Sequence, residues 1–179
     1  MVASRAIGEH RDTMVSQWLD RLGDRANGTS TLPRELVHQE LGLLVDVFGA
    51  LVGPLRREAR PIWQRAAQVY GRHAAARGLA AGEVVEELQY FRELLIRNLA
   101  PAIAALRPRQ SMGLLLRLNR LLDRGVAMAV VGYTDAIVAT LLPSDGEDSP
   151  SRIDDPDSIR SEIDQVREEL SHLTSAEIG

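Results

Sequence analysis

The sequence predicts an all-α protein of about five helices, followed by a flexible linker and a short coiled-coil-like helix. Apolar residues recur every three or four positions in one segment after another, as they do on one face of a helix. Glycine and proline stand at the ends of several of these segments, where helices commonly stop or start. No run alternates between apolar and polar residues, and no Asn-Gly or Asp-Gly turn joins two apolar runs, so no β-hairpin is expected.

Composition limits the classes of protein to which the chain can belong. Its 179 residues suit one domain with a short appendage, and 45% of them are hydrophobic, which is enough for a core. The chain has no cysteine, so disulfides, cysteine-based zinc sites and a thiol nucleophile are excluded. No basic stretch followed by an apolar run is found near the N-terminus. We therefore expect a cytoplasmic protein without a signal peptide.

The charge is divided unevenly along the chain. Residues 1–143 contain 18 arginines and 14 acidic residues, whereas residues 144–179 contain 3 arginines and 11 acidic residues. A mildly positive body with an acidic tail has no basic stripe of the kind that duplex DNA requires. We expect no nucleic-acid partner.

Four helices are predicted in the first hundred residues, at 4–22, 31–53, 61–78 and 82–99. Residues 23–31 are rich in Gly, Asn, Asp and Ser and predict a loop. The apolar faces of these four predicted helices indicate a core built mainly of aliphatic side chains. The faces of the second and fourth helices are the clearest, with Val37, Leu41, Leu44, Phe48 and Leu51 on one and Val84, Leu88, Phe91, Leu95 and Leu99 on the other.

The fifth predicted helix, at residues 110–142, is the longest, about 50 Å at roughly 1.5 Å per residue. One face carries large residues in its first half and small residues in its second half, which permits another backbone to come close. Two interpretations of the small half are open: a central core helix of one protomer, or a helix that also pairs with its copy in a dimer. The small residues, which are candidates for a dimer interface, are Gly125, Ala129, Gly132, Ala136 and Ala139.

Residues 125–142 also approach the shortest length of a membrane span. Asp135 lies in the middle of this segment, and Arg124 directly precedes it. An ionised aspartate at the centre of a bilayer costs several kcal/mol, so we expect no membrane span.

The composition changes after Leu142. Residues 143–156 are rich in Pro, Ser, Asp, Glu and Gly and predict an acidic flexible linker. A helix follows at 157–174, with apolar residues in a four-three repeat like the start of a coiled coil. It is interpreted either as a dimeric connector helix or as an amphipathic helix that folds back on the body. Its candidates for the dimer interface are Ile163, Val166 and Leu170.

No motif in the sequence predicts catalysis. The four histidines include no pair three or four residues apart, so no helical metal site is expected. The chain has neither a Gly-rich phosphate loop with its lysine nor a Gly-x-Ser-x-Gly nucleophile motif. We expect no catalytic residue, no metal and no cofactor.

His73 is the histidine that deserves a separate hypothesis, because it shares an apolar face and lies near Trp63 and Tyr70 of the same predicted helix. In an all-helical protein such a residue can ligate haem. The alternative is a core or pocket-edge histidine bonded to a backbone carbonyl. An aromatic content of 4% supplies little of the packing that haem needs. A haem-binding gas sensor that uses His73 is therefore kept as the alternative to a protein without a cofactor.

Two neighbouring runs resemble a known family. The first is Tyr70-Gly-Arg-His73-Ala-Ala-Ala-Arg77-Gly-Leu, and the second is Glu83-Val-Val-Glu-Glu-Leu-Gln-Tyr90-Phe-Arg-Glu-Leu-Leu. With the order of the helices over residues 12–142, they are similar to the N-terminal sensor domain of RsbR-type stressosome proteins, a domain that also precedes histidine-kinase cores. The resemblance implies a globin-like sensor domain without haem, here at 4–142, that is dimeric, has no catalytic activity and signals through its C-terminal helix.

The resemblance further implies a bacterial signal-transduction module of stress response or two-component regulation. The phosphorylatable output domain that usually follows is not in this sequence, so we expect an output domain elsewhere or a signalling partner, beside a homodimer. A protein-interaction adaptor or scaffold is a further interpretation. The candidates for a ligand pocket are Trp63, Tyr70, His73, Tyr90, Phe91 and Arg92.

Overall fold

The computed structural model describes residues 2–25, 32–141 and 155–175, and these residues form seven helices and no strand. The all-α prediction is confirmed. Residues 142–154, which make up most of the predicted linker, lie outside the described residues. The helices are α1 (Val2–Glu9), α2 (Arg11–Arg25), α3 (Arg34–Val52), α4 (Ala59–Ala76), α5 (Ala81–Ala104), α6 (Pro108–Leu141) and α7 (Pro156–Ser175).

Two helix boundaries differ from the sequence prediction. The segment expected as one helix at 4–22 forms two helices, α1 and α2, which meet at His10. The predicted end near Leu99 is also wrong, because α5 continues through Pro101 to Ala104. A proline inside a helix removes one backbone hydrogen bond and its ring crowds the carbonyl four residues before it, but its φ lies near the helical value. Here α5 continues for three residues beyond Pro101.

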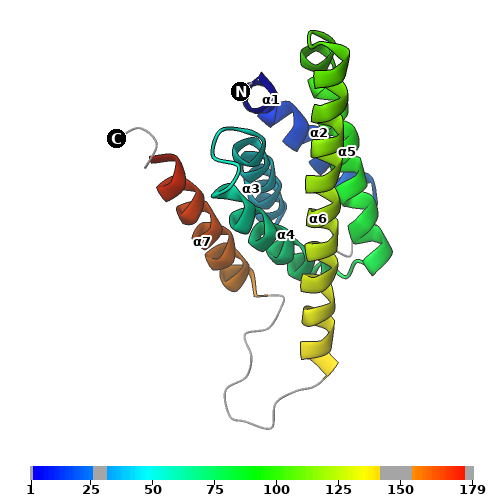
Figure 1. Ribbon diagram of the computed structural model, residues 1–179. Coiled ribbons are helices and arrows are strands. Elements are labelled where there is room, and N and C mark those ends of the chain that lie inside the picture. Colours follow the sequence, from blue (N-terminus) through cyan, green and yellow to red (C-terminus); the bar gives the residue numbers. More distant parts are fainter. Residues whose placement is uncertain (1, 26–31, 142–154, 176–179) are drawn as a thin grey trace.

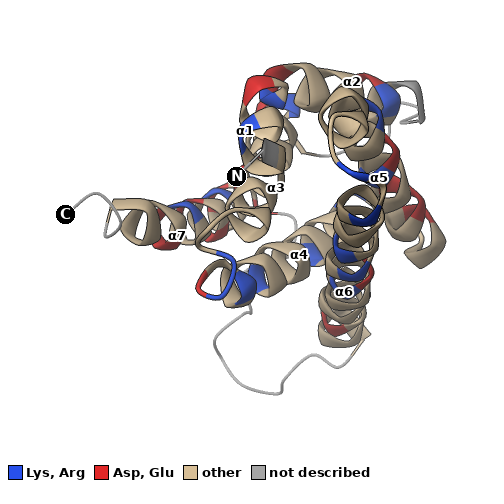
Figure 2. Cartoon of the chain, turned by 45° about the horizontal axis from the view of Figure 1, so that its top comes forward, with Lys and Arg blue, Asp and Glu red and all other residues tan. Residues whose placement is uncertain are grey.

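α4 lies at the centre of the arrangement, with α6 on one side and α7 on the other (Figure 1, Figure 2). α3 packs against α4 and α7, and α5 packs against α6. α1 and α2 pack against α3 and α5 and complete the core. This core is mainly aliphatic, and five aromatic side chains contact one another inside it: Trp18, Phe48, Trp63, Tyr70 and Phe91.

α4 and α6 approach so closely that both helices need glycine at the contact. A Cβ atom on Gly71 of α4 would overlap the backbone carbonyl of Ala129. A Cβ atom on Gly132 of α6 would overlap the backbone carbonyl of Gln68. The small face of α6 therefore packs against α4 of the same chain, backbone to backbone.

This packing bears on the residues expected at a dimer interface. Gly125, Ala129, Gly132 and Ala136 are buried within the chain, whereas Ala139 is exposed. The four buried residues have no free surface to offer a second copy, so in this structure the small face belongs to the core of one protomer. A dimer stays a prediction, and it would need a different surface.

α6 is, within the described part of the chain, the one helix that is long and apolar enough to cross a membrane. Its most apolar window has a mean hydropathy of 1.3, and 22% of that window is buried. One such helix is weak evidence, because core helices can have the same length and composition. Here α6 packs against α4 and α5, and Asp135 stands on its exposed side. No clear membrane span follows from these properties.

Gly132→Ala tests the close approach of α4 and α6. The added methyl group would overlap the backbone of Gln68, so the two helices must move apart. We expect the free energy of unfolding to fall by about 1–3 kcal/mol, measured by urea titration followed by circular dichroism. Gly113→Ala is a matched control on the same helix, because its added Cβ would meet nothing within 4 Å. The control should keep or raise stability, by up to about 1 kcal/mol, and equal losses in the two variants would contradict the close contact.

Candidate functional site

α7 lies across α3 and α4 on the side of α4 that faces away from α6 (Figure 1). Three of its side chains, Ile159, Ile163 and Val166, are buried, and Leu170 and Leu173 are half-buried. These are the positions of the four-three repeat that the sequence offers for a coiled coil. In this structure the repeat folds back on the body of its own chain, which is the second of the two interpretations of this helix.

Ion pairs flank the apolar contact of α7. Glu162 pairs with Arg72, and Glu169 pairs with Arg65, so two of the acidic residues of α7 meet arginines of α4. Each of the four side chains is about one-third to one-half exposed, and ion pairs at such positions add little stability by themselves. Their main effect is to select the register and charge of the docked helix. This contact is named the α7 seam and consists of Ile159, Glu162, Ile163, Val166 and Glu169 on α7 with Arg65, Arg72 and His73 on α4.

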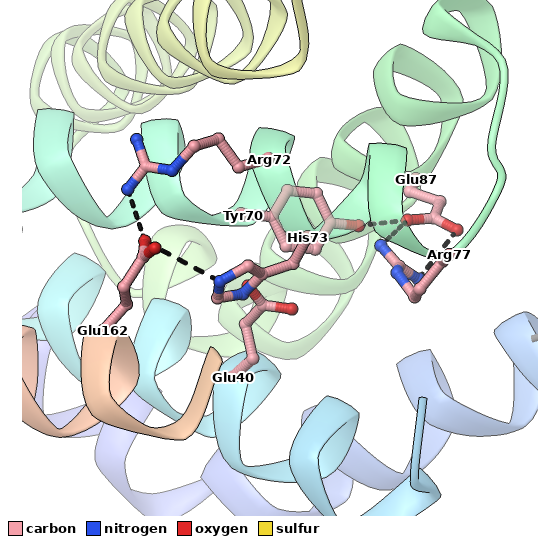
Figure 3. A network of polar contacts seen from close by, with 7 residues as sticks. All are labelled: Glu40, Tyr70, Arg72, His73, Arg77, Glu87 and Glu162. Atoms are coloured by element: carbon pink, nitrogen blue, oxygen red, sulfur yellow. Dashed lines mark hydrogen bonds and ion pairs between the residues drawn. The ribbon is translucent and has the colours of Figure 1, made fainter. Parts of the chain in front are cut away.

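His73 is the innermost residue of the α7 seam and connects the seam with the core (Figure 3). Its side chain is 2% exposed, and its Nδ1 atom is 2.6 Å from Oε1 of the buried Glu40 on α3. Its Nε2 atom has no hydrogen-bond partner among the described residues and is 3.8 Å from Oε2 of Glu162. The imidazole therefore stands between two carboxylates, one in the core and one on α7. The sequence-based interpretation expected a backbone carbonyl as its partner, and the structure places a carboxylate there.

A second buried network joins α4 to α5 (Figure 3). The Arg77 guanidinium donates to both carboxylate oxygens of Glu87, and its Nη2 atom is 2.9 Å from Oε2. The Tyr70 hydroxyl donates to the same carboxylate, and the centre of the Tyr70 ring is 5.3 Å from the guanidinium carbon of Arg77. All three side chains are buried, so the charges of this network are balanced inside the protein rather than by water.

Burial fixes the protonation of this second network. It raises the pKa of the Tyr70 hydroxyl well above the ordinary value of 10, and the charge of Glu87 acts in the same direction. Burial by itself lowers the pKa of Arg77, but Tyr70, Glu87 and Glu40 together raise it. The phenol therefore stays neutral and the guanidinium stays charged, which keeps both of them donors to Glu87.

The two networks bring together no catalytic set of residues. Glu40 faces a histidine, and Glu87 and Glu162 each face an arginine, so none of these carboxylates is free to act on a substrate. Within the described ranges, no group of three or more His, Asp or Glu side chains is placed to hold a metal ion. What the geometry provides is recognition of a helix, by an apolar contact that is flanked by ion pairs and lies over a buried histidine.

The residues expected to line a ligand pocket do not gather at one place. Trp63 is buried, and its Nε1 donates to the carbonyl of Leu121 over 3.0 Å. Phe91 stacks on Trp18 in the core, with 4.6 Å between ring centres. Both side chains therefore serve the packing of the body. Tyr70 and His73, by contrast, belong to the two polar networks on α4.

Tyr90 and Arg92 lie on α5 and have separate surroundings. Tyr90 lines a hollow of about 200 Å3 between α2 and α5, where the Arg21 guanidinium is 5.6 Å from the centre of its ring. Arg92 forms an ion pair with Asp123 of α6. Of the six expected pocket residues, Tyr90 alone lines this hollow. Its other lining residues are Trp18, Arg21, Leu22, Glu86, Glu87, Gln89 and Glu93.

Sequence reasoning singles out Tyr70 and His73 but misses the charged residues that meet them. Glu40 follows Val37 by three residues on the apolar face of α3, and an acid at such a position indicates a buried partner. Arg77, the residue directly after α4, follows His73 by four residues and so continues the same side of that helix. Glu87 lies in the first turns of α5, and the structure buries it. The spacing of these residues is a usable signal, but it does not tell which acid meets which cation.

Comparisons with known proteins found no match among family models, curated proteins or solved structures. The resemblance to RsbR-type sensor domains therefore rests on the two sequence runs and the order of the helices.

Glu87→Gln is expected to be strongly destabilising, because it leaves the buried Arg77 charge without its carboxylate. The loss in the free energy of unfolding should be about 3–5 kcal/mol, measured by urea titration. Glu93→Gln is the matched control, because it removes the same charge from an exposed position on the same helix. It should change stability by less than about 0.5 kcal/mol. Similar small effects of both substitutions would show that Arg77 does not depend on Glu87.

The buried Tyr70 hydroxyl makes the stability of the fold depend on pH in the alkaline range. Because its pKa is raised in the folded state, the neutral phenol contributes its full stability below a pH of about 10 and loses this contribution as the pH rises further. Tyr70→Phe cannot ionise at this position. Between about pH 9 and pH 11, the free energy of unfolding should therefore decrease less in Tyr70→Phe than in the unaltered chain. An equal decrease in both proteins would be evidence that Tyr70 ionises freely in the folded state.

Proposed function

We propose that this chain is a non-enzymatic regulatory module that passes on a signal by docking and releasing its C-terminal helix, α7. The observation that carries this proposal is the α7 seam. It holds a helix of 20 residues by three buried aliphatic side chains and by ion pairs from α7 to α4 that are partly exposed. α1 to α6 supply most of the core cluster, to which α7 adds Ile159, Ile163 and Val166, so α7 can leave without separating the contacts among α1 to α6.

His73 supports a relay between the body and α7. Glu40 of the core and Glu162 of α7 face the two nitrogen atoms of its ring. A shift of α3 against α4 would move the imidazole relative to Glu162 and so change the contact that α7 makes there. A relay needs an element with two positions whose balance depends on the state of the rest of the molecule, and α7 supplies that element.

The resemblance to RsbR-type sensor domains supports the same class of function. The resemblance implies signalling through the C-terminal helix of the sensor domain, which corresponds to α6, and α7 is the helix that follows α6 along the chain. We accordingly propose a globin-like bacterial signal-transduction domain that works as a dimer in the cytoplasm, with a further signalling protein or output domain as its target.

The surroundings of His73 do not favour the alternative of a haem-binding gas sensor. Nδ1 is engaged by Glu40, and Nε2 faces Glu162 beneath α7, so an iron ligated by this residue would have to displace α7. An adaptor or scaffold is the other alternative. It would use the α7 seam as a permanent contact and differs from the proposed module in that α7 is never released.

Distances between two spin labels can show whether α7 is released. The chain has no cysteine, so Ser16→Cys on α2 and Ser161→Cys on α7 provide two specific labelling positions, both exposed. With unlabelled protein in excess, we expect a docked distance and a second, broad component. Glu162→Gln should increase the broad component, because it weakens the contacts with Arg72 and His73.

Asp164→Asn is the matched control for this experiment. It removes the same charge from the exposed side of α7, where Asp164 pairs with Arg167 of the same helix. The distance distribution should stay as in the unaltered sequence. One narrow distance in all three proteins would rule out release and leave the permanent scaffold as the better explanation.

A further inference from the structure

We propose that α7 is exchanged between two copies of this chain, so that the α3–α4 face of one copy binds α7 of the other. The inference rests on the proposed release of α7. The partner is a second copy, and the site completed in the exchanged dimer is the α7 seam. Glu162 and His73 would then come from different copies.

The surface that receives α7 is built by the body alone. α7 packs against α3 and α4, and the arginines of the seam, Arg65 and Arg72, both belong to α4. His73 is positioned by Glu40 of α3, which does not depend on α7. A released α7 therefore leaves a preformed surface that presents apolar contacts, two arginines and the imidazole of His73.

The connection between α6 and α7 is long enough for exchange. Residues 142–155 separate the end of α6 at Leu141 from the start of α7 at Pro156. Fourteen residues can span on the order of 45–50 Å when extended. This reach exceeds the length of α7, which is about 30 Å for its 20 residues. A released α7 can thus reach the body of a neighbouring copy while α6 stays folded.

The recognition chemistry is the same within one chain and between two chains. Glu162 and Glu169 of α7 meet arginines of the body, and every copy carries both halves of this contact. Residues 144–179 contain 11 acidic residues and 3 arginines, whereas residues 1–143 have more arginines than acids. The tail of one copy is therefore attracted by the body of another.

Concentration decides between the two arrangements. An exchanged dimer restores two α7 seams, so no contact of the single chain is lost. Docking within one chain is favoured at low concentration, because the connection keeps α7 near its own body. At high concentration the body of a neighbouring copy competes for α7. Formation of the exchanged dimer then depends on the release of α7.

Reciprocal charge reversal tests this exchange in the full chain. In a first variant, Arg65→Glu and Arg72→Glu make the receiving face acidic. In a second variant, Glu162→Arg and Glu169→Arg make α7 basic. Each variant alone brings like charges together at the seam, so α7 should be released. In a one-to-one mixture, each receiving face finds a helix of opposite charge on the other variant.

The readout follows α7 itself and so separates exchange from any other dimer contact. The first variant carries a spin label at Ser16→Cys, and the second carries one at Ser161→Cys, so a docked distance arises only between copies. We expect it to equal the docked distance within the unaltered chain. We also expect the mixture to form a one-to-one dimer at least about tenfold more tightly than either variant binds itself.

Three outcomes are distinguished. A docked distance in the mixture alone supports exchange. Released helices in both variants without a docked distance in the mixture overturn exchange, while the proposed release of α7 stands. A docked α7 in each variant alone, measured with both labels in one chain and unlabelled protein in excess, contradicts release and therefore the proposed function itself. If circular dichroism shows that a double reversal does not fold, Arg72→Glu mixed with Glu162→Arg applies the same test to one ion pair.

Discussion

The backbone contact between α4 and α6 is the constraint on which the rest of the structure depends. Gly71 and Gly132 let the two helices meet, and this contact fixes the rotation of α4 about its own axis. Successive residues of a helix are turned by about 100°, so His73 points nearly opposite to Gly71. α4 therefore presents one side to α6 and the other to α3 and α7 (Figure 2). The buried small face of α6 and the polar groups beneath α7 both follow from this one orientation.

The buried charges on α4 specify how the body is packed rather than how stable it is. The attraction between Arg77 and Glu87 is offset by the loss of water around both groups, so such a pair adds little net stability. Any packing of the body that leaves Arg77 or Glu87 buried without the other is nevertheless strongly disfavoured. The contact between Glu40 and His73 restricts the packing of α3 against α4 in the same way. Because the packing of the body is fixed, His73 stays at a constant position. Its contact with α7 therefore depends on whether α7 is docked.

α7 is held by a different kind of contact from the helices of the body. Its buried part is three aliphatic side chains, and its ion pairs are partly exposed to solvent. Because rearrangement inside the body is penalised by unpaired charges, the outer helix is the element that moves most easily. Its acidic character keeps it near the arginine-bearing surface even when the apolar contact is open. Helix release and helix recapture are thus governed by charge as well as by apolar contact.

Apart from the break between α1 and α2 and the end of α5, the sequence by itself determined the helices, because helical periodicity and the glycines and prolines at segment ends are local signals. It also pointed to Tyr70 and His73, since polar residues on an apolar face need buried partners. Only the tertiary structure decided that His73 meets Glu40 and Glu162, which come from two other helices. In the same way, the small face of α6 predicted a close neighbour but not that the neighbour is α4 of the same chain, at Gly71. Which helices pack together depends on the whole set of faces at once, and no local pattern contains that information.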